Sequence, residues 1–404
     1  MEGHVRCASW IRRPENAHLV IMAKSTRGPS SSSLEVLSFD AKTCSLSSSP
    51  EVVYECEEDI LSIAVHPSGD DIVCSTTKGG CKLHSGDVRA QYATNVDKMI
   101  GYVLILFELC GRDENLNLVT KDSPPLQGVG LQKCLAFSVD GSRFAIGGED
   151  GHLRIFEWPS LRILLDEPKA HKSFRDMDFS LDTEFLASTS ADGSARVWKI
   201  DDGVPLTSLT RNSDERIECC RFSKDGSKPF LFCTVQKGDK AVTAVWDIST
   251  WNRIGHKRLL RKPAAILSIS LDGKYLALGS KDGDLCVVEV KKMEISHWSK
   301  RLHPGTCISS LEFCPSERLM LSTSSQWGGM VTKLSVPADW KEWQIYMVLL
   351  GLFLASAILF YIFFQNSDSF WNFPLGHQST RPKFEAVFVD PHSEDQNVWG
   401  PLDL

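Results

Sequence analysis

Three aspartates that lie close together in the sequence are the first candidates for chemistry. Asp176, Asp178 and Asp182 alternate with other residues around a short apolar run. Neighbouring carboxylates can transfer protons or hold a cation, but an aspartate after a strand commonly closes a turn. The chain has no G-x-x-x-x-G-K-[ST], G-x-S-x-G or H-E-x-x-H motif. We therefore interpret the three aspartates as structural and predict no catalytic residue.

Histidines and basic side chains give two further groups. His66 and His171 are interpreted either as residues that lock a structural repeat or as surface histidines. A basic group near the N-terminus could face anionic lipid or an acidic partner, but we favour a solvated loop. Its members are Arg12, Arg13, Lys24 and Arg27.

Cysteine spacing and net charge exclude several classes of protein. The 13 cysteines form no C-x-x-C pair and no Cys/His cluster at zinc spacing, so we predict reduced core cysteines, no metal and no cofactor. A net charge of −7 argues against nucleic-acid binding. The N-terminus lacks the pattern of a signal peptide, so we expect the part before any membrane helix to stay in the cytosol.

One apolar segment near the C-terminus has the length of a membrane span. It covers 345–364, from Ile345 to Phe364, and contains no charged residue. Twenty helical residues span about 30 Å, the thickness of a hydrocarbon core. Trp343 and Trp371 flank it and Tyr346 lies at its start, as interfacial aromatics do. We predict a linker at 337–344, a membrane anchor at 345–364 and a lumenal tail at 365–404.

The preceding residues contain a repeated pattern of a short apolar run, a Ser-x-Asp-Gly turn and a second apolar run. Clear copies begin at Ser138, Ser180 and Ser270, looser copies at His66, Ser223 and Cys314, and a degenerate one near Ile11. Asp-Gly pairs favour tight hairpins, and most spacings between copies are 42 to 55 residues, close to the period of a four-stranded WD-repeat blade. The sequence therefore predicts an all-β, seven-bladed WD-repeat β-propeller at 1–336, followed by a single transmembrane helix. We expect the strand near His4 to close the ring by joining the last blade.

One interval between repeats is too long. The segment 84–106 accounts for the excess and differs in composition from its surroundings. We interpret it as an atypical insertion into a strand of the second blade, either genuine or a retained intron. If every transcript carries its 23 codons and the protein is stable, the intron interpretation is wrong.

Several short segments resemble a known family. They begin at Asp166, Leu311, Trp340 and Asn366 and read DEPKAHKS, LEFCPSER, WKEWQIY and NSDSFW. These segments are similar to the plant phosphate transporter traffic facilitators. That group is a branch of a family of ER-membrane propellers whose founding members are guanine-nucleotide exchange factors for the small GTPase of COPII coats. The resemblance implies a cytosolic propeller, one ER-membrane helix and a lumenal tail.

The resemblance also implies where exchange activity would lie. The active enzymes carry a glycine-rich loop in the first blade, followed by an Asn, which holds potassium through oxygen ligands. Here the corresponding loop has lost that pattern, since Gly28 alone remains and two cations have entered. Its residues are Ala23, Lys24, Ser25, Thr26, Arg27 and Gly28. Such side chains resist the backbone angles that glycine permits, so we predict neither potassium binding nor exchange activity.

We therefore expect a non-catalytic ER-membrane accessory protein that promotes the ER exit of phosphate transporters, its cargo, towards the plasma membrane. Binding of the COPII GTPase without exchange stays open. The alternatives are an active exchange factor for that GTPase and a membrane-anchored scaffold for another cargo or for a regulatory complex.

Overall fold

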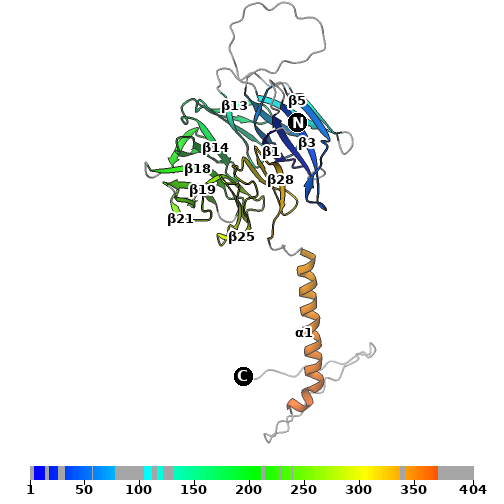
Figure 1. The fold of residues 1–404 in the computed structure, drawn as a ribbon. Coiled ribbons are helices and arrows are strands. Elements are labelled where there is room, and N and C mark those ends of the chain that lie inside the picture. The colour runs from blue at the N-terminus through cyan, green and yellow to red at the C-terminus, as the bar shows by residue number, and fades with distance from the viewer. Residues whose placement is uncertain are drawn as a thin grey trace, which may run out of the picture. The chain divides into compact units, whose positions relative to one another are not determined.

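The computed structural model divides the chain into two compact units, Met1–Val336 and Pro337–Leu404. It describes residues 4–13, 18–25, 32–56, 58–77, 104–111, 116–121, 131–210, 214–226, 229–238, 240–336 and 342–371. The first unit is built from antiparallel strands that follow one another around a ring, and the second contains one helix (Figure 1).

The described strands form seven sheets, the blades of a β-propeller. Blades one and two contain β1(His4–Trp10), β2(Leu19–Ser25), β3(Ser32–Asp40), β4(Ser45–Leu46), β5(Val52–Cys56), then β6(Ile60–Val65), β7(Asp71–Thr76), β8(Leu104–Cys110) and β9(Asn117–Lys121). Blades three and four contain β10(Gln132–Phe137), β11(Arg143–Gly148), β12(Leu153–Glu157), β13(Arg162–Glu167), then β14(Phe174–Phe179), β15(Phe185–Ser190), β16(Ala195–Lys199) and β17(Val204–Ser208).

The remaining three blades follow the same order, with the first strand innermost. Blades five and six contain β18(Glu215–Phe222), β19(Phe230–Lys237), β20(Lys240–Asp247), β21(Arg253–Lys257), then β22(Ala264–Ile269), β23(Tyr275–Ser280), β24(Leu285–Glu289) and β25(Glu294–Ser299). Blade seven contains β26(Ser310–Phe313), β27(Leu319–Ser324) and β28(Gly328–Lys333). The prediction of a seven-bladed propeller is confirmed.

The repeated Ser-x-Asp-Gly segment forms the turn between the first and second strands. In blade three, the Ser138 hydroxyl accepts a hydrogen bond from the Arg143 amide at 2.9 Å, and Asp140 accepts one from the Ser142 amide at 3.1 Å. Gly141 has a φ of 74°, a left-handed conformation that glycine adopts without steric cost. This turn explains why the motif recurs once per blade.

His171 locks blade four, one of the two interpretations offered for it. Its Nε2 lies 2.8 Å from the Ser188 hydroxyl, which also accepts a hydrogen bond from the Trp198 indole at 2.8 Å. In blade seven, the buried His303 lies 2.8 Å from Ser322 and 2.9 Å from Ser324. Each imidazole therefore holds the loop that precedes the first strand of its blade against the second strand of the same blade.

These two histidines predict how stability depends on pH. Burial lowers the pKa of each imidazole to about 4, from an ordinary value near 6.5. The unfolded chain therefore takes up protons below pH 6.5 that the folded chain does not bind. We expect the free energy of unfolding to be highest above pH 6.5. Between pH 6.5 and 4 it should fall by about 1.4 kcal/mol per pH unit for each of the two histidines.

Thermal melts between pH 7.5 and 5 measure this dependence. The variant His171→Gln should show a shallower slope than the unaltered protein, because one titrating group is gone. A melting temperature that stays constant over this range would contradict the assignment.

The closure of the ring differs from the prediction. β1 does not join the last blade; it pairs with β2 as the innermost strand of blade one. Its side chains Val5, Ala8 and Trp10 are buried in a core shared with blade seven, whereas outermost strands such as β9 alternate between exposed and half-buried residues. Among the described strands, blade seven has only three, and β1 contacts all of them across the junction; Figure 1 shows β1 beside β28.

A side-chain clasp spans this junction, where the two blades share none of the described strands. Glu312 on β26 accepts hydrogen bonds from the Ser9 hydroxyl at 2.7 Å and the Trp10 amide at 3.0 Å. Its other oxygen accepts one from Arg12 at 3.0 Å. Because both carboxylate oxygens bind groups of blade one, Glu312 links the two ends of the propeller sequence.

The prediction that 84–106 is an insertion is wrong for its last three residues. Leu104, Ile105 and Leu106 belong to β8 and pair with β7. Leu104 and Leu106 are buried, so packing within the propeller explains why they continue the strand. Residues 84–103 lie outside the described residues.

The second unit contains helix α1(Glu342–Trp371). It begins within the predicted linker 337–344 and extends seven residues beyond the predicted anchor 345–364. Its stretch Trp343–Gln365 is long and apolar enough to cross a membrane. Large apolar side chains along this stretch, including Ile345 and Phe364, are exposed, as expected of a lipid-facing helix rather than a core helix.

Candidate functional site

The predicted degenerate loop begins at the end of β2. Ala23 is buried in the core between blades one and two, and Lys24 and Ser25 are the last two residues of β2. Thr26, Arg27 and Gly28 lie outside the described residues. The structure therefore places the first half of the predicted site at the base of the connection between β2 and β3.

Lys24 forms an ion pair at this base. β2 and β3 pair antiparallel, with Lys24 opposite Ser33, so Glu35 lies two residues further along on the same face. Lys24 Nζ contacts the Glu35 carboxylate, and the Ser33 hydroxyl donates to Glu35 at 3.2 Å. The carboxylate of Glu35 is thus already bound by an ammonium and a hydroxyl.

A second carboxylate, that of Asp59, also lies at the base of this loop. Asp59 accepts a hydrogen bond from the Ser25 hydroxyl at 2.8 Å and contacts Arg6 at 3.3 Å. Potassium would need several oxygen ligands, yet the two carboxylates here are occupied by Lys24, Ser25 and Arg6. Among the described residues, no group of three His, Cys, Asp or Glu side chains could hold a metal ion. Both carboxylates of the described base therefore already have partners within the chain.

The interpretation of the basic group as a solvated loop is wrong for its three described members, since Lys24 belongs to β2 and pairs with Glu35. Arg12 binds Glu312 of blade seven. Arg13 binds Asp70 of blade two at 2.6 Å and donates to the Gly111 carbonyl at 3.2 Å. Both arginines therefore tie blade one to its neighbours, because their guanidinium groups reach across the gaps between blades.

The three aspartates have structural partners. Asp176 accepts hydrogen bonds from the Cys220 amide at 3.0 Å and Arg221 at 2.6 Å. Asp178 accepts one from the Phe222 amide at 2.8 Å. Asp182 accepts one from the Glu184 amide at 3.1 Å. The first two join blade four to blade five, and the third closes a turn.

His66 also contacts a neighbouring blade. Its Nδ1 lies 2.8 Å from the Ser68 hydroxyl, and its Nε2 lies 3.2 Å from the Gly141 carbonyl of blade three. This histidine therefore links the turns of two adjacent blades, which is a structural role.

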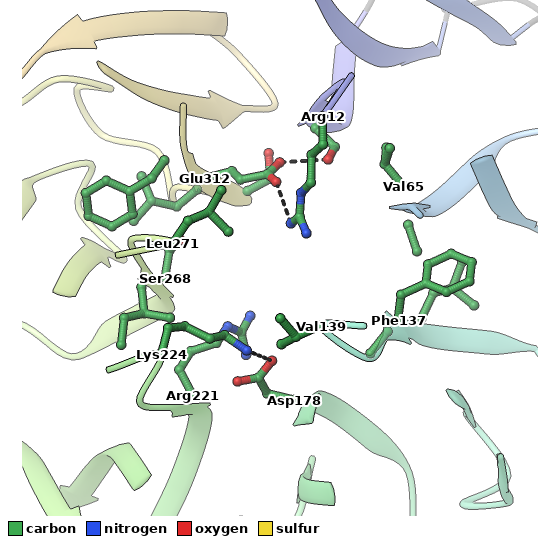
Figure 2. Close-up of a pocket in the computed structure, with 18 of the residues that line it drawn as sticks. Arg12, Val65, Phe137, Val139, Asp178, Arg221, Lys224, Ser268, Leu271 and Glu312 are labelled. Carbon is green, nitrogen blue, oxygen red and sulfur yellow. Dashed lines mark hydrogen bonds and ion pairs between the residues drawn. The ribbon is translucent and has the colours of Figure 1, made fainter. Parts of the chain in front are cut away.

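A second site, which sequence reasoning missed, lies where the seven first strands meet. The mouth of the central channel is a cavity of about 290 Å³, lined by residues of all seven blades (Figure 2). Six residues from the turns after the first strands surround it, and we call them the channel collar. They are Arg12, Val139, Leu181, Lys224, Leu271 and Pro315.

Comparison with known proteins places the chain in a family. A WD domain, G-beta repeat model matches residues 128–157 and 162–199. The chain is 56% identical to SEC12-like protein 1 of Arabidopsis thaliana over 413 residues, covering 100% of this chain and 98% of the relative. It belongs to the SEC12-like family of WD-repeat proteins.

More distant members extend this similarity. SEC12-like protein 2 of Arabidopsis thaliana is 30% identical over 305 residues, which cover 74% of this chain and 71% of the relative. The guanine nucleotide-exchange factor SEC12 of Rattus norvegicus is 27% identical over 203 residues, which cover 46% of this chain and 48% of that protein. This SEC12-like chain is thus related to an exchange factor.

Proposed function

We propose that this SEC12-like protein is an ER-membrane accessory factor that promotes the exit of phosphate transporters from the ER and has no exchange activity of its own. The contact between Lys24 and Glu35 carries the second half of this proposal. It puts an ammonium at the base of the blade-one loop, where the resemblance implies that active enzymes hold a potassium ion. Because Lys24 already neutralises Glu35, this carboxylate is not left to balance the charge of a bound cation.

Nucleotide release tests the proposed lack of exchange activity. The full chain in lipid nanodiscs is mixed with the COPII small GTPase carrying fluorescent GDP, with rat SEC12 as the positive control. We expect the release rate to stay within about twofold of the spontaneous rate, because the loop sequence has lost the glycines and the Asn that the resemblance implies for active enzymes. A tenfold acceleration would instead favour the alternative, an exchange factor.

The cargo half of the proposal rests on the resemblance of the short segments DEPKAHKS, LEFCPSER, WKEWQIY and NSDSFW. Loss of the gene should leave phosphate transporters in the ER while other plasma-membrane proteins travel normally. Imaging of tagged transporters in such cells measures this directly. A general block of export would point to the exchange factor, and undisturbed transporters would point to a scaffold for another cargo.

We propose that the propeller faces the cytosol and that the tail after α1 faces the ER lumen. The chain contains no N-x-[ST] sequon, so glycosylation can report topology once a sequon is introduced. Gln378→Asn creates Asn-Ser-Thr in the tail, and we expect a glycosidase-sensitive increase in mass. Gln378→Ala is the matched control, and an unglycosylated Gln378→Asn protein would contradict a lumenal tail.

A further inference from the structure

The channel mouth carries cations whose hydrogen-bonding capacity is largely unused. Arg12 and Lys224 extend into the cavity from opposite walls (Figure 2). Among the described residues, Arg12 donates one hydrogen bond, to Glu312 at 3.0 Å, although a guanidinium has five N–H donors. Lys224 Nζ lies 3.8 Å from Asp178 and donates at 3.4 Å to the Phe179 carbonyl. Both cations can therefore accept a further anionic partner.

The acidic side chains of the mouth are directed towards its walls. Glu312 and Asp178 occupy corresponding positions on the first strands of blades seven and four. Each accepts an amide hydrogen bond from the first strand of the next blade, from Trp10 at 3.0 Å and Phe222 at 2.8 Å. Because these carboxylates share their charge with backbone amides, they only partly neutralise the cations beside them.

The surroundings of Lys224 destabilise its charged form. Its side chain is only 12% exposed. Burial lowers its pKa below the ordinary value, and Arg221 and Arg12 lower it further, while Asp178 opposes the shift. Arg221, by contrast, is bound closely by Asp176 at 2.6 Å and by the Cys220 carbonyl at 2.5 Å. A carboxylate that enters the mouth would therefore stabilise the charged form of Lys224, whereas Arg221 already has close partners.

The collar adds apolar surface around these charges. Val139, Leu181 and Leu271 are 36%, 39% and 49% exposed, and Pro315 completes the apolar part. Exposed apolar side chains that cluster around a concave opening are typical of a protein-binding surface. The cavity of about 290 Å³ has room for a side chain but not for a folded element.

We propose that the channel mouth binds an acidic side chain on an exposed segment of a partner protein, with apolar neighbours of that side chain packed against the collar. The carboxylate lies between Lys224 and Arg12, and the flanking apolar residues contact Val139, Leu181 and Leu271. Building on the proposed function, the partner is the phosphate transporter, and the segment is one of its cytosolic loops or termini.

Peptide binding to the full chain in nanodiscs tests the site. Fluorescent 15-residue peptides that tile the cytosolic segments of a phosphate transporter are titrated and followed by anisotropy. We expect at least one acidic peptide to bind, and its Asp→Asn or Glu→Gln version to bind about tenfold more weakly, as the loss of a charge-assisted hydrogen bond implies. Equal affinity for both versions would overturn the proposal.

Variants of the protein locate the binding to the channel mouth. Lys224→Met and Leu271→Asp should each weaken binding about tenfold, because they remove the cation or charge the collar. Leu206→Asp, at an exposed position on the outer strand β17, and Lys262→Met, on an exposed loop, are the matched controls and should bind within twofold of the unaltered protein. Leu271→Asp lies at an exposed position, so it reports on the site even if Lys224→Met fails to fold.

The proposed site and the proposed function are overturned by different results. Absence of any peptide binding, or binding that survives Leu271→Asp, excludes the channel mouth. In cells that lack the gene, rescue of transporter delivery by the unaltered chain tests the proposed function alone. If both the unaltered chain and Leu271→Asp rescue, the function stands and the site is wrong; if neither form rescues, the proposed function is wrong.

Discussion

Replacing Glu312 with alanine is expected to lower the free energy of unfolding of the propeller by about 3 kcal/mol, since it removes three hydrogen bonds worth about 1 kcal/mol each. The carboxylate binds Ser9, Trp10 and Arg12 across the junction of blades seven and one. The Trp10 amide and the Arg12 guanidinium would lose this partner in a partly buried place. No strand is shared at this junction among the described residues, so the ring should open there first.

Denaturant unfolding of Met1–Val336, the compact first unit, measures the effect. Glu317→Ala changes an exposed glutamate of the same blade and should alter the free energy of unfolding by less than about 0.5 kcal/mol. Asp178→Ala removes the corresponding carboxylate between blades four and five, which the chain connects directly. If Glu312→Ala behaves like Glu317→Ala, the clasp does not hold the ring closed.

The blades could be predicted from the sequence because their turns are local. Asp140, Gly141 and Ser142 form a turn through contacts within five residues, so the motif repeats wherever a blade repeats. The position of β1 could not be predicted in the same way. An innermost and an outermost strand both alternate along the sequence, and only the burial of Val5, Ala8 and Trp10 against blade seven distinguishes them.

The candidate sites show the same division. Lys24 was found from its place in the loop, but its partner Glu35 depends on the register between β2 and β3, which the sequence does not specify. The sequence contains a signal that would have placed Arg12 and Lys224 together at the channel mouth. Both occupy the second position of the repeated turn, where the other collar residues are apolar. Aligning the repeats by that position would have placed two cations around one axis.

Charging the helix should release the protein from membranes. Thirteen of the twenty residues in 345–364 are Leu, Ile, Val or Phe, which favours insertion by about 5 kcal/mol at roughly 0.4 kcal/mol each. Leu354→Arg and Leu359→Arg together should cost about 7 kcal/mol, counting about 3 kcal/mol for each arginine and the loss of each leucine. The balance of about 2 kcal/mol against insertion corresponds to less than a tenth of the chains in the membrane.

Alkaline extraction of membranes, followed by quantification of pellet and supernatant, measures this shift. The conservative pair Leu354→Ile and Leu359→Ile should leave the protein in the pellet, because it keeps the apolar surface that α1 exposes. If the double arginine variant also stays in the pellet, the propeller itself must hold the membrane or a membrane protein. Since the proposed function needs the collar near cargo in the same membrane, we expect the released variant to lose rescue of transporter delivery while its propeller stays folded.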